Sequence, residues 1–146
     1  MRALLQRVSR AAVRVDGHVI GAIGPGLLLY VAVELGDGEP AIAWMAEKIP
    51  HVRIFQDAEG KLNRSILDVR GDILAVSAFT LAGDARRGRR PSFDRSAPAA
   101  EAGPLFQKIV DKLAATGLRI ETGQFQAVME VESVNDGPVM LLLDSR

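Results

Sequence analysis

The sequence predicts an α+β fold in which a mostly antiparallel, barrel-like sheet is combined with two main helices. Short apolar segments bounded by Gly, Pro, Asn and Asp occur in both terminal parts of the chain, which is typical of antiparallel strands. Two segments with apolar residues at helical spacing interrupt these strands. Because a chain of 146 residues fits one hydrophobic core, we expect a single domain over residues 1–146.

The N-terminal part predicts four strands. They cover residues 4–8, 11–15, 19–23 and 27–33. Turns at Asp16-Gly17 and at Gly24-Pro25-Gly26 follow the second and third strands, and we expect each turn to join antiparallel neighbours.

The first helix is predicted over residues 38–49. Ile42, Met45 and Ile49 recur on one face, Asp37 can cap the start, and Pro50 marks the end. The second helix has an apolar stripe made of Leu105, Phe106, Ile109, Val110 and Leu113. Pro104 indicates either a late start or a kink, and Gly117 ends this helix.

Between and after the helices we expect further strands. A short strand covers residues 52–55 and is followed by a turn over 57–60. A central buried strand covers 73–81, since this segment is almost continuously apolar. The segment 82–98 is too long for a tight connection and is therefore a candidate functional loop. The last strands cover 119–122, 127–134 and 139–143, with a turn at Asn135-Asp136-Gly137-Pro138 between the final two.

The composition excludes several function classes. The chain has no cysteine, so a disulfide framework and a thiolate metal site are impossible. A net charge of zero argues against broad, sequence-independent coating of nucleic acid. No apolar run approaches the roughly 20 residues that span a bilayer, and we expect a cytoplasmic protein.

The usual catalytic groups of hydrolases are scarce. His18 and His51 lie in a predicted hairpin and at a helix exit, and no motif brings them together, so both are interpreted as surface residues rather than a base or a metal ligand. We expect no metal and no cofactor. The glycines around Gly21 lack the lysine and the following helix that a phosphate-binding loop requires.

Two adjoining segments remain as candidate sites. Residues 77–81, Ser-Ala-Phe-Thr-Leu, put two hydroxyls and an aromatic ring at the end of the buried strand, although ordinary strand residues give the same pattern. The loop that follows carries Arg86, Arg87, Arg89 and Arg90. Guanidinium groups suit phosphate, and a solvated charge run is the alternative. Phe93 could stack on a base or anchor the loop.

Several segments, taken in their order along the chain, resemble the segments of a known protein family. They read MRALLQRVSRAAVRVDG, IGPGLLLYVAVELGD, KIPHVRIFQDAEGKLNRSILDV, VSAFTL, GRRPSF, and VNDGPVM followed by LLLD. On these segments the chain resembles, from end to end, the bacterial and eukaryotic D-aminoacyl-tRNA deacylases, also called D-tyrosyl-tRNA deacylases. The resemblance implies a small barrel-like fold and a homodimer with two active sites at its interface.

The resemblance also implies site residues. A Ser-Gln-Phe-Thr motif of the family lines the pocket and falls here on Ser77, Ala78, Phe79 and Thr80. A Gly-Pro motif, here Gly137-Pro138 followed by Val139 and Met140, has a cis peptide bond and projects into the partner's pocket. Met129 is assigned to the same substrate-binding set.

The implied activity is hydrolysis of the ester between a D-amino acid and the 3′ end of tRNA. Rigid carbonyl oxygens of the Gly-Pro motif would stand where an L side chain has to go, whereas glycine escapes this clash. For cleavage, Thr80 is one candidate nucleophile, but it has no evident base. The alternative is that the terminal ribose 2′-hydroxyl helps to activate water, with backbone N–H groups near Phe79 and Thr80 stabilising the oxyanion. The basic loop would meet the tRNA acceptor end.

Three residues depart from the family pattern. Ala78 replaces the glutamine, Gln126 replaces a glycine, and Met140 replaces a threonine. The loss of an amide and a hydroxyl removes polar partners from the implied site. A non-catalytic or altered-specificity homodimer that binds the tRNA end or a small ligand is therefore the alternative function.

Overall fold

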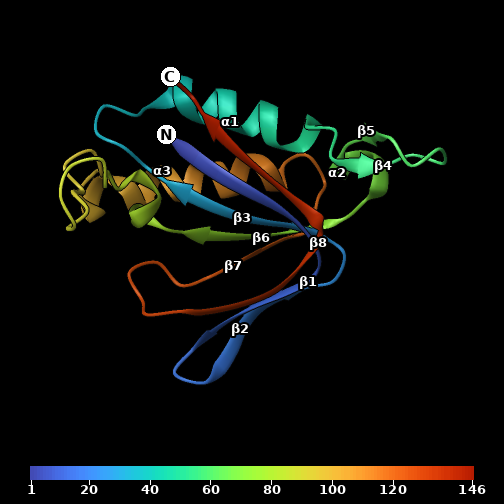
Figure 1. Ribbon diagram of the computed structural model, residues 1–146, viewed down its shortest axis with the longest axis horizontal. Coiled ribbons are helices and arrows are strands. Elements are labelled where there is room, and N and C mark those ends of the chain that lie inside the picture. The colour runs from blue at the N-terminus through green and yellow to red at the C-terminus, as the bar shows by residue number, and fades with distance from the viewer.

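The computed structural model describes residues 1–146 and shows a strongly curved sheet with two long helices against one of its faces (Figure 1). The strands are β1 (Arg2–Val15), β2 (His18–Ile23), β3 (Gly26–Ala32), β4 (Phe55–Gln56), β5 (Leu62–Arg64), β6 (Asp72–Ser77), β7 (Ile120–Thr122) and β8 (Glu130–Asp144). The helices are α1 (Glu39–His51), α2 (Ile66–Val69), the 3₁₀ helix η1 (Phe79–Ala82) and α3 (Ala99–Ala114). The predicted α+β class with a barrel-like sheet and two main helices is confirmed.

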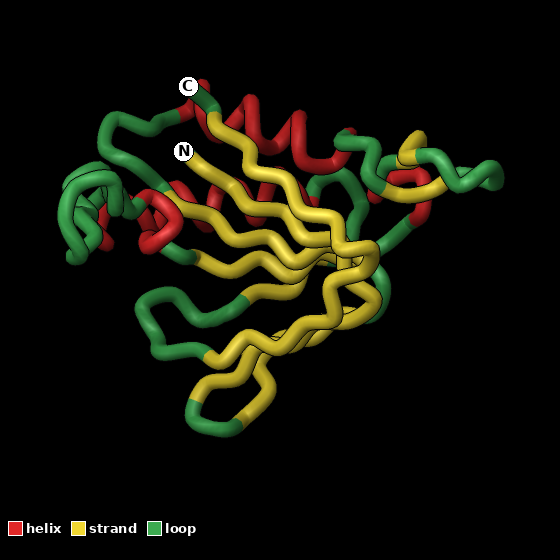
Figure 2. Tube along the Cα trace, in the orientation of Figure 1, coloured by secondary structure: helices red, strands yellow, loops and turns green.

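Strand β1 organises the sheet, because it is paired along both of its edges (Figure 2). Antiparallel β8 follows one edge over nearly the whole length of β1. Along the other edge β3 and β2 lie one after the other, since Val8 pairs with Gly26 and Ala11 pairs with Ile23. The predicted break between residues 8 and 11 is therefore wrong: Ser9 and Arg10 are exposed, but the strand continues through them.

The turn at Gly24-Pro25 is also different from the prediction. It does not fold β2 back onto β3, because both strands pair with β1 and continue along the same edge. The turn at Asp16-Gly17 does join the antiparallel neighbours β1 and β2. A local turn signal marks where the chain bends, but strand pairing determines which strand lies next to which.

The other half of the sheet is parallel. β3 pairs with β6, and β6 pairs with β7, both in parallel, whereas the three pairings of β1 are antiparallel and make the sheet mostly antiparallel, as predicted. The parallel pairs arise because helical crossovers connect their strands: α1 and α2 lie between β3 and β6, and α3 lies between β6 and β7. The predicted strand 73–81 ends at Ser77, where the chain turns into η1.

The main core lies between the sheet and the two long helices. Ile42, Met45 and Ile49 of α1 are fully buried, as predicted from their spacing. Helix α1 ends one residue after Pro50 rather than before it. From α3, the buried residues are Phe106, Ile109, Val110 and Leu113. None of the helices is long and apolar enough to cross a membrane.

The two predicted C-terminal strands are one strand, β8. Gln6 pairs with Met140 and Val8 with Asn135, so residues 136–139 form a bulge opposite the single residue Arg7. The predicted hairpin turn is wrong because both halves of β8 find the same partner strand. We call residues 136–139 the β8 bulge.

The prediction missed α2 and β5. Helix α2 begins with a capping box between Ser65 and Asp68. The expected strand over 52–55 is reduced to β4, which pairs only with β5.

Candidate active site

A cleft of about 750 Å³ opens between the end of β6, the start of α3 and the segment that leads into β8. Thirteen of its 17 lining residues are hydrophobic, and none is Asp, Glu, His, Lys or Arg. Its polar side chains are those of Ser77, Thr80, Ser96, Gln126 and the phenol of Tyr30. Burial raises the pKa of Tyr30, so the phenol stays protonated at neutral pH. The cleft therefore offers neutral hydrogen-bonding groups in apolar surroundings.

The first wall comes from the end of β6. The Ala78 N–H donates to the Val31 carbonyl at 2.8 Å, and the chain then turns into η1. No side chain caps the start of η1. Phe79 and Thr80 follow, with Phe79 57% exposed. All four predicted residues of this motif line the cleft, but the cleft has no carboxylate or imidazole that could take a proton from Thr80.

Residues 93–97 support this wall. The Ser96 hydroxyl donates to the Phe79 carbonyl at 3.2 Å, and the Phe93 ring meets the Phe79 ring edge-on at 5.2 Å between centroids. An ion pair of 3.0 Å joins Arg95 to the fully buried Glu34 carboxylate. Sequence reasoning missed Ser96, whose only signal was its position just after Phe93 in the functional loop. Phe93 anchors this loop on Phe79 in the structure.

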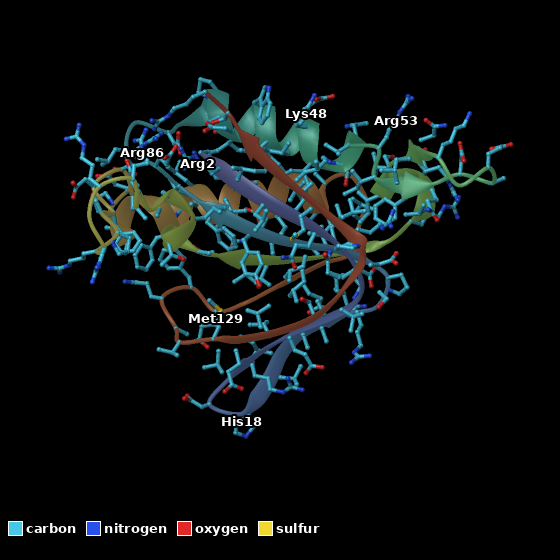
Figure 3. All side chains as sticks on the ribbon, viewed as in Figure 1. Arg2, His18, Lys48, Arg53, Arg86 and Met129 are labelled. Atoms are coloured by element: carbon cyan, nitrogen blue, oxygen red, sulfur yellow. The ribbon has the colours of Figure 1, made fainter.

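The facing wall lies between β7 and β8. Phe125 stacks on the buried Phe106 of α3, with 6.5 Å between ring centroids. Gln126 and Met129 also line the cleft, and Figure 3 labels Met129 just before β8. The backbone of Gln126 is left-handed, with φ of 61°.

Gly137 and Pro138 do not line this cleft. They lie in the β8 bulge, are exposed, and are joined by a cis peptide bond. The buried Arg7 side chain donates to the Asp136 carbonyl at 3.1 Å and to the Ile54 carbonyl at 2.7 Å. The Asn135 amide donates to the carbonyls of Arg7 and Val139 at 2.9 and 3.1 Å. The bulge therefore lies outside the cleft of its own chain, and side-chain hydrogen bonds hold its backbone.

Apolar side chains are exposed along β8 on both sides of this bulge. They are Val134, Met140, Leu141 and Leu142, and Leu142 is 58% exposed. Strand β8 pairs only with β1, so its outer edge has unpaired backbone groups. An open edge with exposed apolar residues is a typical surface for another chain.

The four predicted arginines are exposed on the loop beside η1, where Figure 3 labels Arg86. Arg86 forms an ion pair with Asp84, which lowers the pKa of that carboxyl and raises the pKa of Arg86. Arg87, Arg89 and Arg90 form no ion pair within the chain. Neither histidine lies in the cleft: His18 is at the tip of the β1–β2 hairpin and His51 at the end of α1.

Comparison with known protein families matches residues 4–144 to the family described as D-Tyr-tRNA(Tyr) deacylase. The chain belongs to the D-Tyr-tRNA(Tyr) deacylase family. It is 55% identical over 145 residues to the D-aminoacyl-tRNA deacylase of Symbiobacterium thermophilum, covering 99% of this chain and 96% of that protein. It is 53% identical over 146 residues to the D-aminoacyl-tRNA deacylase of Geobacter sulfurreducens, covering 100% and 96%. The family predicted from the sequence, and the ester hydrolase class that its name denotes, are confirmed.

Two solved structures resemble this deacylase family member over almost the full chain. The c-Myc DNA Unwinding Element Binding Protein has a TM-score of 0.95 at 37% identity, covering 100% of this chain and 99% of that one. A probable eukaryotic D-amino acid tRNA deacylase has a TM-score of 0.82, covering 97% of each chain. Its identity is 18%, so this second likeness concerns the fold alone.

The three departures from the deacylase pattern lie in different places. Ala78 and Gln126 both line the cleft. Met140 lies beside the β8 bulge, is 53% exposed, and its sulfur accepts a hydrogen bond from the Gln6 amide at 3.5 Å. The left-handed backbone at Gln126 has the conformation that glycine adopts most readily, which fits the glycine that the family pattern has there.

Proposed function

We propose that this chain hydrolyses the ester between a D-amino acid, or glycine, and the 3′ end of tRNA, and that it does so in the cytoplasm as a homodimer. Membership of the deacylase family supports the activity. One observation carries the homodimer: Gly137 and Pro138 are held in an exposed bulge that does not reach the cleft of their own chain. A second copy, docked on the open edge of β8, would bring each bulge to the partner's cleft.

The bulge would then reject L-amino acids. Arg7 and Asn135 fix the backbone on both sides of Gly137-Pro138, so the carbonyls there have little freedom to move. Fixed oxygens placed against the α-carbon exclude a side chain on one side of that carbon, whatever its chemistry. The same filter accepts many D side chains, and it does not exclude glycine.

The chemistry would use neutral groups. An apolar cleft without a carboxylate, imidazole or amine suits a mechanism in which the ribose 2′-hydroxyl of the tRNA helps to activate water. The backbone N–H groups near Phe79 and Thr80 would stabilise the oxyanion that forms at the ester carbonyl oxygen when water adds to the carbonyl carbon. Thr80 would line the cleft without acting as a nucleophile, because no base is near its hydroxyl.

The basic loop would contact phosphates of the tRNA acceptor end. Arg86 is partly neutralised by Asp84, so Arg87, Arg89 and Arg90 would carry most of the attraction. Replacing these three by Ala should reduce the slope of log affinity against log salt by about 2 to 3. The slope is measured from tRNA binding at several salt concentrations. An unchanged slope would remove the loop from the proposed tRNA contact.

A binding function without catalysis is the second candidate. It is motivated by Ala78 and Met140, which lack the amide and hydroxyl of the family pattern. One solved relative is named for binding a DNA unwinding element, and the basic loop would suit such a partner equally well. Tight binding of tRNA or single-stranded DNA with no release of amino acid would favour this candidate.

The deciding experiment measures release of amino acid from D-tyrosyl-tRNA and L-tyrosyl-tRNA. We expect preferential release of D-tyrosine, and equal rates for both substrates would reject the chirality filter. A Pro138→Ala variant should lose much of this preference while keeping its cleft.

Mixed dimers test whether the site is shared. One parent carries Ala78→Trp, which fills its cleft, and the other carries deletion of Gly137 and Pro138. The first parent should be inactive alone because its cleft is filled, and the second should hydrolyse D- and L-tyrosyl-tRNA without preference because its sites lack the bulge. Refolding the two together should restore the preference for D-tyrosyl-tRNA at about a quarter of all sites, since half of the random dimers have one intact pair of cleft and bulge. No recovery in dimers shown to be mixed would contradict the shared site.

A further inference from the structure

We infer that Gln126 is a substrate-binding residue, whose side-chain amide hydrogen-bonds to the adenine base at the tRNA 3′ end. The inference deepens the proposed function and rests on it.

The backbone at Gln126 is unfavourable for glutamine. Gln126 is the third residue of a turn in which the Ala127 N–H donates to the Gln124 carbonyl at 3.3 Å, and its φ is 61°. A positive φ at the third position of a turn favours glycine, because a side chain there meets the backbone. Left-handed residues other than glycine cluster at binding and active sites. Glycine would fit the backbone of this turn better than glutamine. The presence of a glutamine side chain at position 126 therefore calls for an explanation other than the fold.

The side chain lies at the rim of the cleft. It is exposed, lines the cleft, and makes no hydrogen bond within the chain. The other polar side chains of the cleft end in hydroxyl groups, whereas Gln126 has the only carboxamide there. A carboxamide presents one acceptor and two donor hydrogens side by side. It can therefore pair with a ligand group that offers a donor next to an acceptor.

Adenine is the substrate group that fits. Its edge presents the N6 amino donor beside the N7 acceptor, and a glutamine amide can bind both. Phe79 and Phe125 line the same cleft and offer apolar ring faces against which a purine can pack. The amino acid varies from one tRNA to another, but the terminal adenosine does not. An enzyme that accepts many D side chains can use one amide for all its substrates only if that amide binds a group that they share. The terminal adenosine is such a group.

The test compares D-tyrosyl-tRNA ending in adenosine with the same tRNA ending in inosine or in purine riboside, which lack the N6 amino group. We expect wild-type kcat/KM to be about tenfold higher for the adenosine end. In Gln126→Ala this preference should fall to about twofold or less. A wild-type enzyme without the preference, or an alanine variant that keeps it, would overturn the inference.

Two further variants separate binding from backbone effects. Gln126→Gly removes the amide and relieves the left-handed backbone, so it should lose the adenosine preference while its melting temperature stays equal or rises. Gln124→Ala changes an exposed neighbour in the same turn that does not line the cleft, and it should keep the preference. A Gln126→Gly variant that still prefers adenosine would also overturn the inference.

A binding measurement keeps the inference separate from the proposed activity. Calorimetry with a non-hydrolysable amide analogue of D-tyrosyl adenosine, and with its inosine counterpart, needs no turnover. If hydrolysis fails but Gln126 still gives tighter binding of the adenosine analogue, the proposed function falls and the base contact stands. If hydrolysis is D-specific but both analogues bind equally, the base contact falls alone.

Discussion

The cleft wall at Phe79 and the β8 bulge at Gly137-Pro138 are held in opposite ways. The cleft is apolar, and one side-chain hydrogen bond, from Ser96, reaches the backbone of its first wall at Phe79. The bulge is exposed, yet hydrogen bonds from the buried Arg7 side chain and from the Asn135 amide hold the backbone in and beside it. In the proposed function the cleft receives D side chains of many kinds, and the β8 bulge has to exclude L-amino acids. Side-chain hydrogen bonds to the backbone are thus more numerous at the bulge, where the proposed discrimination takes place, than at Phe79.

The largest expected effect comes from separating the two regions. Leu142→Asp puts a carboxylate on the exposed apolar edge next to the bulge, and burying it against a second copy is costly. We expect monomers by light scattering, with the preference for D- over L-tyrosyl-tRNA reduced about 100-fold or more because the partner's bulge is absent. Val19→Asp is the control, because Val19 is similarly exposed at 52% but lies on β2. A monomeric Leu142→Asp enzyme that keeps the full preference would show that one chain forms a complete site.

Loosening the bulge should have the next largest effect. Arg7→Met keeps an apolar stem but leaves the buried Ile54 carbonyl and the Asp136 carbonyl without their donor, and it removes the ion pair with the Asp136 carboxylate. We expect the free energy of unfolding to fall by about 2–4 kcal/mol and L-tyrosyl-tRNA to become a substrate. Denaturant unfolding and parallel D and L assays measure the two effects.

A second arginine of β1 provides the control for this change. Arg14 pairs with Glu132 at 2.9 Å on a more open part of the strand, and Arg14→Met should cost less than about 1 kcal/mol. Equal losses for the two variants, with L-amino acids still rejected, would mean that Arg7 does not position the bulge.

On the cleft side, Ser96→Ala removes the hydrogen bond to the Phe79 carbonyl. Because a peptide group is planar, this bond also sets the direction of the Thr80 N–H. We expect kcat to fall about fivefold with little change in KM. Ser96→Thr, which keeps the hydroxyl, should recover most of the rate. A change in KM alone would place Ser96 in substrate binding instead.

The smallest effect is expected for Thr80→Ala. The Thr80 hydroxyl has no base beside it, so we expect single-turnover rates to stay within about threefold of wild type. Loss of an essential nucleophile would cost about 1,000-fold or more. A loss of that size in a folded variant that still binds substrate would assign the nucleophile to Thr80.

Sequence patterns alone predicted the family, both long helices and most strand positions. Helical spacing identified the buried face of α1, and the order of motifs pointed to Ser77–Thr80 and to Gly137-Pro138 as site residues. These features are readable because they depend on local periodicity or on contiguous residues. The same information located the long loop that was expected over 82–98.

Strand pairing and long-range packing, which exist only in the folded chain, determine how these segments are arranged. Pairing to one shared strand turned the expected C-terminal hairpin into a bulge and placed β2 and β3 on one edge of β1. The contacts that matter for the site join residues far apart in the chain, such as Arg7 with Asp136 and Phe79 with Ser96. Local patterns specify which face of a segment is apolar, whereas strand pairing and long-range packing select the neighbour that covers it.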